Sequence, residues 1–236
     1  MRILLGSSVC LRRKAKILGH SRTTIARKLA FLGEQDLRWL KRQMTASEAK
    51  PLAEIQFDEL ETFEHTKMKP LSVPLAVDAK TRRILAFDVC RMPAKGPLAE
   101  RSRSKYGIRK NERPNALSQM MKALKPWVGP KTVLRSDSHP YYPPAVRRHF
   151  PKAQHLQEES RSGCITGQGE LKEGRWDPLF SINHTCAMLR ANVSRLIRRT
   201  WCTTKKPLAL KHHVAIYVRL HNEVLIQAPS TAKWAS

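Results

Sequence analysis

Three apolar segments follow one another between residues 54 and 89, and each has the length and pattern of a β-strand. Residues 54–63 alternate between apolar and polar side chains, whereas residues 71–77 and 83–89 are short runs rich in Val, Leu, Ile and Phe. Residues 78–82 have the composition of a hairpin turn between the last two runs. Strands joined so closely in sequence pair antiparallel, so the sequence predicts three consecutive antiparallel strands.

Helices and strands alternate after this group. The expected elements are a helix at 115–125, a strand at 131–136, a helix at 145–150, a strand at 153–157, a long helix at 182–201 and a final helix at 207–222. This order is that of the ribonuclease-H-like fold, an α/β fold with a mixed five-stranded sheet and flanking helices. We therefore expect one such domain over residues 54–225, followed by a tail at 226–236.

A helical segment precedes this domain. Ala15, Gly19 and Ile25 have the order of a helix-turn-helix, in which a small residue lets the helices approach, a glycine adopts the turn and a β-branched residue fills the space between them. We expect residues 1–40 to be an all-α DNA-binding arm and residues 41–53 a linker. An ordinary basic helical hairpin has the same pattern. The second helix would present four polar side chains to DNA: Arg22, Thr23, Arg27 and Lys28.

The net charge indicates a polyanionic partner. The 236 residues include 44 Lys and Arg against 19 Asp and Glu, which gives a formal charge of +25. Cations that neutralise phosphates release counterions, so double-stranded DNA is the expected partner, with an RNA binder of the ribosomal type or a merely basic surface as alternatives. Residues 93–113 are expected to form a flexible loop that either contacts DNA or is solvated without a role, and Trp201 is expected to lie in the core in preference to stacking on a base. Six C-terminal cations are expected to contact the DNA backbone: Arg190, Arg195, Arg198, Arg199, Lys205 and Lys206.

No segment approaches the roughly 20 apolar residues that a membrane-spanning helix needs. The five cysteines are odd in number and widely scattered, which indicates reduced thiols and not a disulfide framework or a zinc ribbon. A cytoplasmic protein is the expectation.

Two aspartates occupy positions where this fold would hold metal ions. Phosphoryl transfer on DNA uses two divalent cations about 4 Å apart, and carboxylates are their preferred ligands. In this topology the ligands come from the middle of the first strand, the end of the fourth strand and the start of the long helix. Asp58 and Asp137 stand at the first two places. Taken singly, Asp58 also fits a surface carboxylate and Asp137 a turn former.

Residues 56–63 and 133–137 resemble the catalytic segments of DDE-type transposases from short bacterial insertion sequences, and the stretch that begins at Asn183-His184 resembles their C-terminal helical part. The resemblance covers roughly residues 8–225. It implies a transposase that binds terminal inverted repeats and target DNA and that cuts and joins strands with two Mg²⁺ ions, for which Mn²⁺ could substitute. It also implies a homodimer or larger synaptic assembly, associated with the nucleoid of the bacterial cytoplasm.

The resemblance further implies a third metal ligand. The family usually places a glutamate at the start of the long helix, where this chain has Asn183, so the implied set is Asp58, Asp137 and Asn183. Glu170, at a separation of 170 − 137 = 33 residues from Asp137, is the alternative third ligand. His184 is expected either to assist at the metal or phosphate or to pack in the core. Two other functions stay open: a helix-turn-helix regulator without catalysis, and an inactive transposase relic.

Overall fold

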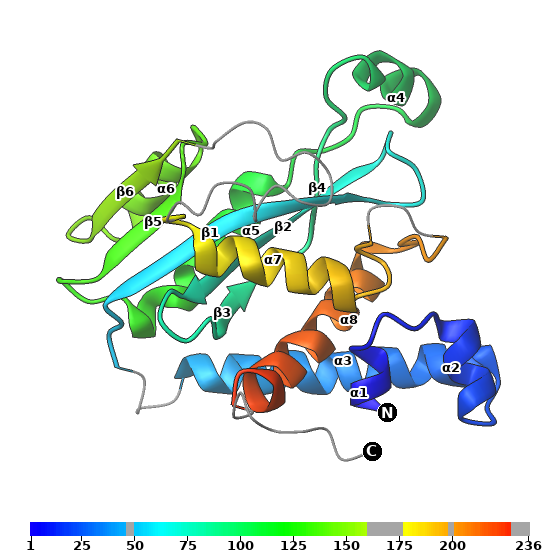
Figure 1. Ribbon diagram of the computed structural model, residues 1–236. Helices are drawn as coiled ribbons and strands as arrows, with labels where there is room; N and C mark the ends of the chain where they lie inside the picture. The colour runs from blue at the N-terminus through cyan, green and yellow to red at the C-terminus, as the bar shows by residue number, and fades with distance from the viewer. Residues whose placement is uncertain (46–49, 160–176, 198–200, 228–236) are drawn as a thin grey trace.

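A mixed sheet forms the centre of the molecule (Figure 1). The computed structural model describes residues 1–45, 50–159, 177–197 and 201–227. The main strands lie in the order β3-β2-β1-β5-β6, and the short β4 pairs with the first residues of β2. Their bounds are Glu54–Phe63 for β1, Pro70–Asp78 for β2, Ile84–Phe87 for β3, Cys90–Arg91 for β4, Val133–Asp137 for β5 and Gln154–Glu158 for β6.

The strand directions agree with the predicted topology. β2 runs antiparallel to both β1 and β3, whereas β5 runs parallel to β1 and β6 runs parallel to β5. The ribonuclease-H-like class expected from the sequence is thus confirmed. The sheet has six strands and not five, because the two residues of β4 were not predicted as a strand.

Helices cover both faces of the sheet. α5 (Arg113–Leu124) and α6 (Tyr142–His149) pack on the face that carries Ile55 and Phe57, whereas α7 (Phe180–Asn192) and α8 (Pro207–Leu220) pack on the face that carries Leu60. Figure 1 shows α7 in front of β1 and α5 behind the sheet. Because side chains alternate along a strand, β1 contributes to two separate cores.

The N-terminal helices pack on α8. They are α1 (Arg2–Leu5), α2 (Leu11–Ile17) and α3 (Arg22–Thr45). The turn between α2 and α3 has Gly19 at φ 63°, and the Ser21 hydroxyl accepts a hydrogen bond from the Thr24 N–H at 3.0 Å, so the predicted helix start is confirmed. Ile25 is fully buried, as expected for the residue that fills the space between the two helices.

Two predicted boundaries differ from the structure. α3 continues to Thr45, past the expected start of the linker at residue 41. The long helix α7 ends at Asn192 instead of residue 201, because Val193 already adopts an extended conformation (φ −96°, ψ 103°). Beyond this end Trp201 is fully exposed, so its predicted place in the core was wrong.

The expected flexible loop at 93–113 contains a helix, α4 (Leu98–Tyr106). This helix projects from the end of the β1–β2 hairpin, away from the other helices (Figure 1). In the described part of the chain, every helix is too short or too polar to cross a membrane.

Candidate active site

Asp58 and Asp137 lie next to each other on neighbouring parallel strands. The register pairs Gln56 of β1 with Arg135 of β5, and two residues further along each strand are Asp58 and Asp137. Parallel strands lie about 4.8 Å apart, and residues in register point to the same face. Both carboxylates therefore lie on the face covered by α7. The structure brings together the two acids that the sequence singled out.

The close approach of the two acids appears in the electrostatics of Asp58. Burial, the larger cause, and the negative charge of Asp137 raise the pKa of Asp58 to about 6. Two hydrogen bonds to Asp58 Oδ1 act in the opposite direction, from the Glu59 N–H at 2.6 Å and from the Tyr142 hydroxyl at 3.3 Å. Burial and the nearby carboxylates hold the pKa of Tyr142 far above its ordinary range, so the hydroxyl remains a donor.

A buried ion pair on the opposite face of β1 supports the segment after Asp137. The Arg113 Nε lies 2.7 Å from Glu59 Oε2, and the two side chains are 7% and 4% exposed. Arg113 also donates through Nη2 to His139 Nε2 at 3.0 Å, and the His139 backbone N–H donates to Asp137 Oδ1 at 3.1 Å. Arginine has no acceptor, so Nε2 of His139 carries no proton. Burial and the Arg113 charge lower the pKa of His139 accordingly.

Sequence reasoning missed this network. The sequence placed Arg113 at the end of the loop expected at 93–113 and His139 in the turn after Asp137, with no contact to either aspartate segment foreseen. Tyr142, which is buried and packs on Phe57, was missed as well. The signal in the sequence was weak, because Arg113 and Tyr142 lie 54 and 84 positions away from their partners Glu59 and Asp58 on β1.

The start of α7 is fixed to β1 by Gln56. This buried side chain donates to the Pro178 carbonyl at 2.9 Å and accepts from the Ile182 N–H at 3.1 Å. Gln56 is two residues before Asp58 on the same face of the strand, so the amino end of α7 lies about 7 Å along the strand from Asp58. The fold thus brings the start of the long helix toward the two aspartates.

Asn183 lies in the first turns of α7, and its side chain is exposed. Its Nδ2 donates to Asp177 Oδ2 at 2.9 Å, while Asp177 Oδ1 accepts from the Leu179 N–H at 2.9 Å. Asp177 was not singled out from the sequence, although an acid just before Pro-Leu-Phe at a helix start was the available signal. The alternative ligand, Glu170, lies outside the described residues.

His184 is half-buried beside Arg82 and the Phe180 ring, with its ring nitrogens 3.4 Å from the Arg82 guanidinium. Burial and the Arg82 charge lower its pKa. This places His184 toward the β2–β3 turn, in a packed position and not at the aspartates.

The donor set fits a divalent cation in its chemistry. Asp58 and Asp137 present hard carboxylate oxygens whose mutual repulsion a cation would relieve. Across residues 1–45, 50–159, 177–197 and 201–227, no cluster of three His, Cys, Asp or Glu side chains is close enough to enclose an ion. Asp58 and Asp137 are therefore a pair of neighbouring carboxylates without a third acid, histidine or cysteine placed to share an ion with them in the described part of the chain.

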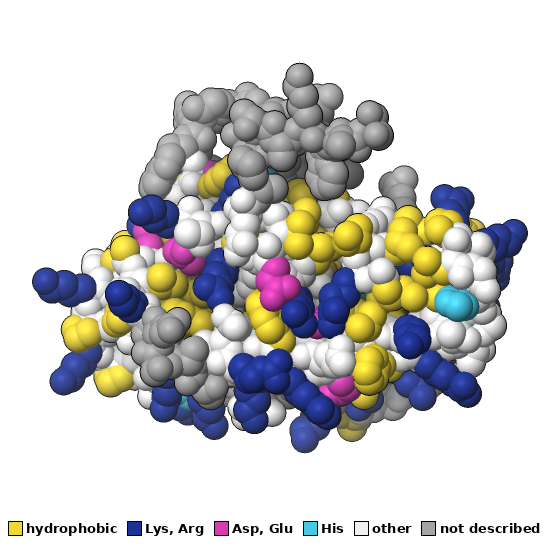
Figure 2. All heavy atoms as spheres, turned by 90° about the horizontal axis from the view of Figure 1, so that it is seen from below, with side chains coloured by type: hydrophobic (Ala, Val, Ile, Leu, Met, Phe, Trp, Pro, Cys, Tyr) yellow, Lys and Arg dark blue, Asp and Glu magenta, His cyan; other side chains and the backbone are white. Residues whose placement is uncertain are grey.

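The predicted DNA-contacting residues are placed unevenly. Arg22, Thr23, Arg27 and Lys28 are all exposed at the start of α3, and Lys205 and Lys206 are exposed before α8. Figure 2 shows the face that includes α3, where Lys and Arg outnumber Asp and Glu. Arg190 is half-buried, and Arg198 and Arg199 lie outside the described residues.

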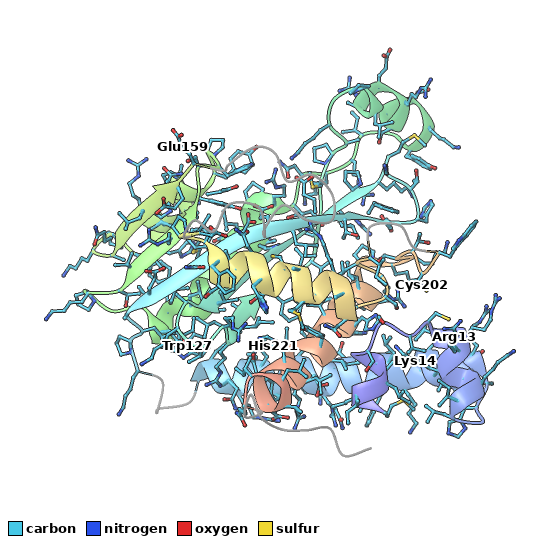
Figure 3. All side chains as sticks on the ribbon, viewed as in Figure 1. Arg13, Lys14, Trp127, Glu159, Cys202 and His221 are labelled. Carbon is cyan, nitrogen blue, oxygen red and sulfur yellow. The ribbon has the colours of Figure 1, made fainter. Side chains whose placement is uncertain are left out.

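Arg195 is half-buried. Burial lowers the pKa of its guanidinium, and it lies near the buried Lys14 of α2 and near Cys202. Figure 3 shows Lys14 and Cys202 on these neighbouring segments, with Arg13 beside Lys14 on α2. Arg195 is thus less accessible to a DNA phosphate than the exposed Lys205 and Lys206.

Comparisons with known proteins add one structural likeness. No family model matches the sequence, and no curated protein is similar to it. A chain from the crystal structure of the Mos1 strand transfer complex is similar in structure, with a TM-score of 0.31 and 11% sequence identity, over 88% of this chain and 70% of that chain.

Proposed function

We propose that this chain is a transposase that cuts and joins double-stranded DNA with divalent metal ions. The observation that carries the proposal is the pairing of Asp58 and Asp137 on adjacent parallel strands, with the pKa of Asp58 raised to about 6. Acids that share a partly enclosed site at the cost of mutual repulsion mark a functional site more often than a structural one. A regulator without catalysis would gain nothing from this arrangement.

Each of these residues has a proposed role in metal binding or DNA recognition. Asp58 and Asp137 would hold Mg²⁺ or Mn²⁺, which supplies charge stabilisation to the attacking and leaving oxygens when bound. The Tyr142 hydroxyl orients the Asp58 carboxylate, and the Glu59–Arg113–His139 network fixes the backbone next to Asp137. The exposed Arg22, Thr23, Arg27 and Lys28 of α3 would read the terminal inverted repeats, as in a helix-turn-helix.

The third metal donor is proposed to come from the start of α7. Asn183 is the position implied by the family resemblance, and it is hydrogen-bonded to the carboxylate of Asp177. A carboxylate binds Mg²⁺ more strongly than a neutral amide, so we assign the donor to Asp177 and an orienting role to Asn183. Because the described acids form no group of three around one point, the start of α7 would have to move toward the aspartate pair when a metal ion binds.

The test is a strand-transfer assay with Asp58→Asn and Asp137→Asn, on duplexes that carry the inverted repeats flanking the gene. Each substitution removes a metal ligand without changing a phosphate contact, so strand transfer should be lost in both variants. Gel shifts without metal should show DNA binding near the wild-type level. Near-normal transfer by either variant would refute the assignment, and loss of binding in both would mean that the aspartates stabilise the fold.

A further inference from the structure

Residues 93–112, here called the arm, leave the sheet after β4 and return to it at α5. Helix α4 occupies the middle of the arm and projects beyond the sheet (Figure 1). Glu100 and Glu112 are its two acids. Five cations of the arm are exposed: Lys95, Arg101, Arg103, Lys105 and Lys110. Arg101 and Arg103 form no ion pair within the part of the chain that the structure describes.

Hydrogen bonds anchor the arm to the sheet and to the β1–β2 hairpin. The Arg109 guanidinium donates to Glu64 Oε2 at 2.8 Å and to the carbonyls of Met92 and Pro70 at 3.1 and 3.3 Å. The hydroxyl of Ser102, a buried residue in α4, donates to the Met68 carbonyl at 2.6 Å. A surface that is already ordered loses little conformational entropy when it binds a partner.

Both ends of the arm join the sheet beside residues of β1 that follow Asp58. The first residue after the arm is Arg113, whose Nε lies 2.7 Å from Glu59 Oε2. Near the other end, Lys95 Nζ lies 2.7 Å from Glu61 Oε1. Duplex DNA that continued from Asp58 and Asp137 along the β1–β2 hairpin would therefore meet the arm, which projects from the end of that hairpin (Figure 1).

We propose that the arm is a clamp that grips the backbone of duplex DNA at the end of the β1–β2 hairpin. The clamp rests on the proposed function for its partner, because cations alone do not select DNA. Exposed, unpaired guanidinium groups on a fixed helix are suited to phosphate oxygens, which they bind without reading the sequence. The clamp thus adds general affinity for DNA that extends away from the aspartate pair, separate from recognition by α3.

The experiment compares two triple variants of the full-length chain, with EDTA present so that no DNA is cut. The arm variant is Arg101→Gln, Arg103→Gln and Lys105→Gln. The control is Arg147→Gln, Arg148→Gln and Lys152→Gln, which removes three exposed cations in and after α6, on the other side of the sheet (Figure 1). The dissociation constant for a labelled duplex is measured over a series of KCl concentrations.

Each phosphate contact contributes about 0.9 to the slope of log K against log salt, so the arm variant should lose about 2 to 3 from the slope. The control variant should keep the wild-type slope. Equal slopes in both variants, or an equal loss in both, would overturn the clamp. The outcome is separate from the proposed function: a wild type that shows the arm-dependent slope but transfers no strand keeps the clamp and refutes the transposase.

Discussion

Asp58 carries its charge in an unfavourable environment. Burial and the neighbouring Asp137 raise its pKa to about 6, whereas the pKa of an aspartate in an unfolded chain has its ordinary value of 3.8. The folded protein therefore binds the Asp58 proton more tightly than the unfolded chain does. This contribution to stability is fully present below about pH 4 and is lost as the pH rises through about 6. The site keeps two acids together at the expense of stability, as expected of groups retained for binding a cation.

Asp58→Asn should consequently stabilise the metal-free protein at neutral pH. A pKa difference of about 2 units corresponds to about 3 kcal/mol, which is the upper estimate of the gain at pH 7. The measurement is urea unfolding in EDTA at several pH values, with an exposed Asn, Asn111→Asp, as a control for introducing or removing one acid. The gain should disappear below about pH 4. A gain that did not change with pH would show that repulsion and burial of the charge are not its cause.

At the scale of single residues, the sequence predicted the acids and missed their supports. Asp58 and Asp137 could be found because strand order and position define them. Arg113, His139 and Tyr142 could not, because their contacts depend on where α5 begins and on how the turn after β5 folds back. The alternation of side chains along β1 places Glu59 on the face opposite Asp58. Its ion pair with Arg113 could not be predicted, because it forms only when α5 packs on that face.

At the scale of secondary structure, periodicity predicted most of the elements and misjudged several ends. The helix expected at 115–125 is present as α5, and its apolar side chains Leu117, Met120, Met121 and Leu124 are all buried. The stripe of α7 was extended too far, because Val193 and Leu196 are buried in the same core although the helix has already ended. An apolar period does not distinguish a continuing helix from a turn that packs on the same core. Helix α4 in the arm was not predicted, because its residues are mostly polar and form no apolar stripe.

The start of α7 is the element on which the third metal donor depends. Gln56 fixes this end to β1, and Asp177 and Asn183 are hydrogen-bonded there. Asp177→Asn should reduce strand transfer strongly and raise the Mg²⁺ concentration needed for half-maximal rate, since a charged donor is lost. Asn183→Ala should cost about tenfold, because it removes only an orienting contact. The readout is strand transfer over a Mg²⁺ titration, with Asn192→Ala at the far end of α7 as a control. An inactive Asn183→Ala beside an active Asp177→Asn would return the donor role to Asn183.

At the scale of the whole molecule, the N-terminal helices and the sheet domain share a core. Leu5 and Leu29 pack with Ile216 of α8, and Leu40 lies in the larger core beside α7 and α8. Gly33 allows α3 to cross α8 closely: a Cβ at this position would lie 2.3 Å from the Cβ of His212. A second link is the Leu5 carbonyl, which accepts hydrogen bonds from Lys14 Nζ at 3.3 Å and from His213 Nε2 at 2.7 Å. The sequence suggested a separate DNA-binding segment over residues 1–40 on a linker, because the residue pattern alone does not reveal which surface a helix covers.

Removing residues 1–40 should therefore unfold the rest of the chain and not merely abolish recognition of the terminal repeats. Leu5, Leu29 and Leu40 pack in cores shared with the rest of the chain and are at most 5% exposed, and burial of such side chains contributes about 1.5 to 3 kcal/mol each. Their sum, about 4.5 to 9 kcal/mol, is comparable to the whole stability of a typical domain. Thermal unfolding followed by circular dichroism should show no cooperative transition in the truncated chain. The full-length double variant Arg27→Gln and Lys28→Gln, which changes two exposed residues of α3, should keep the wild-type midpoint and lose preference for the terminal repeat in competition gel shifts. A truncated chain that unfolded cooperatively near the wild-type temperature would show that the N-terminal helices fold independently of the sheet domain.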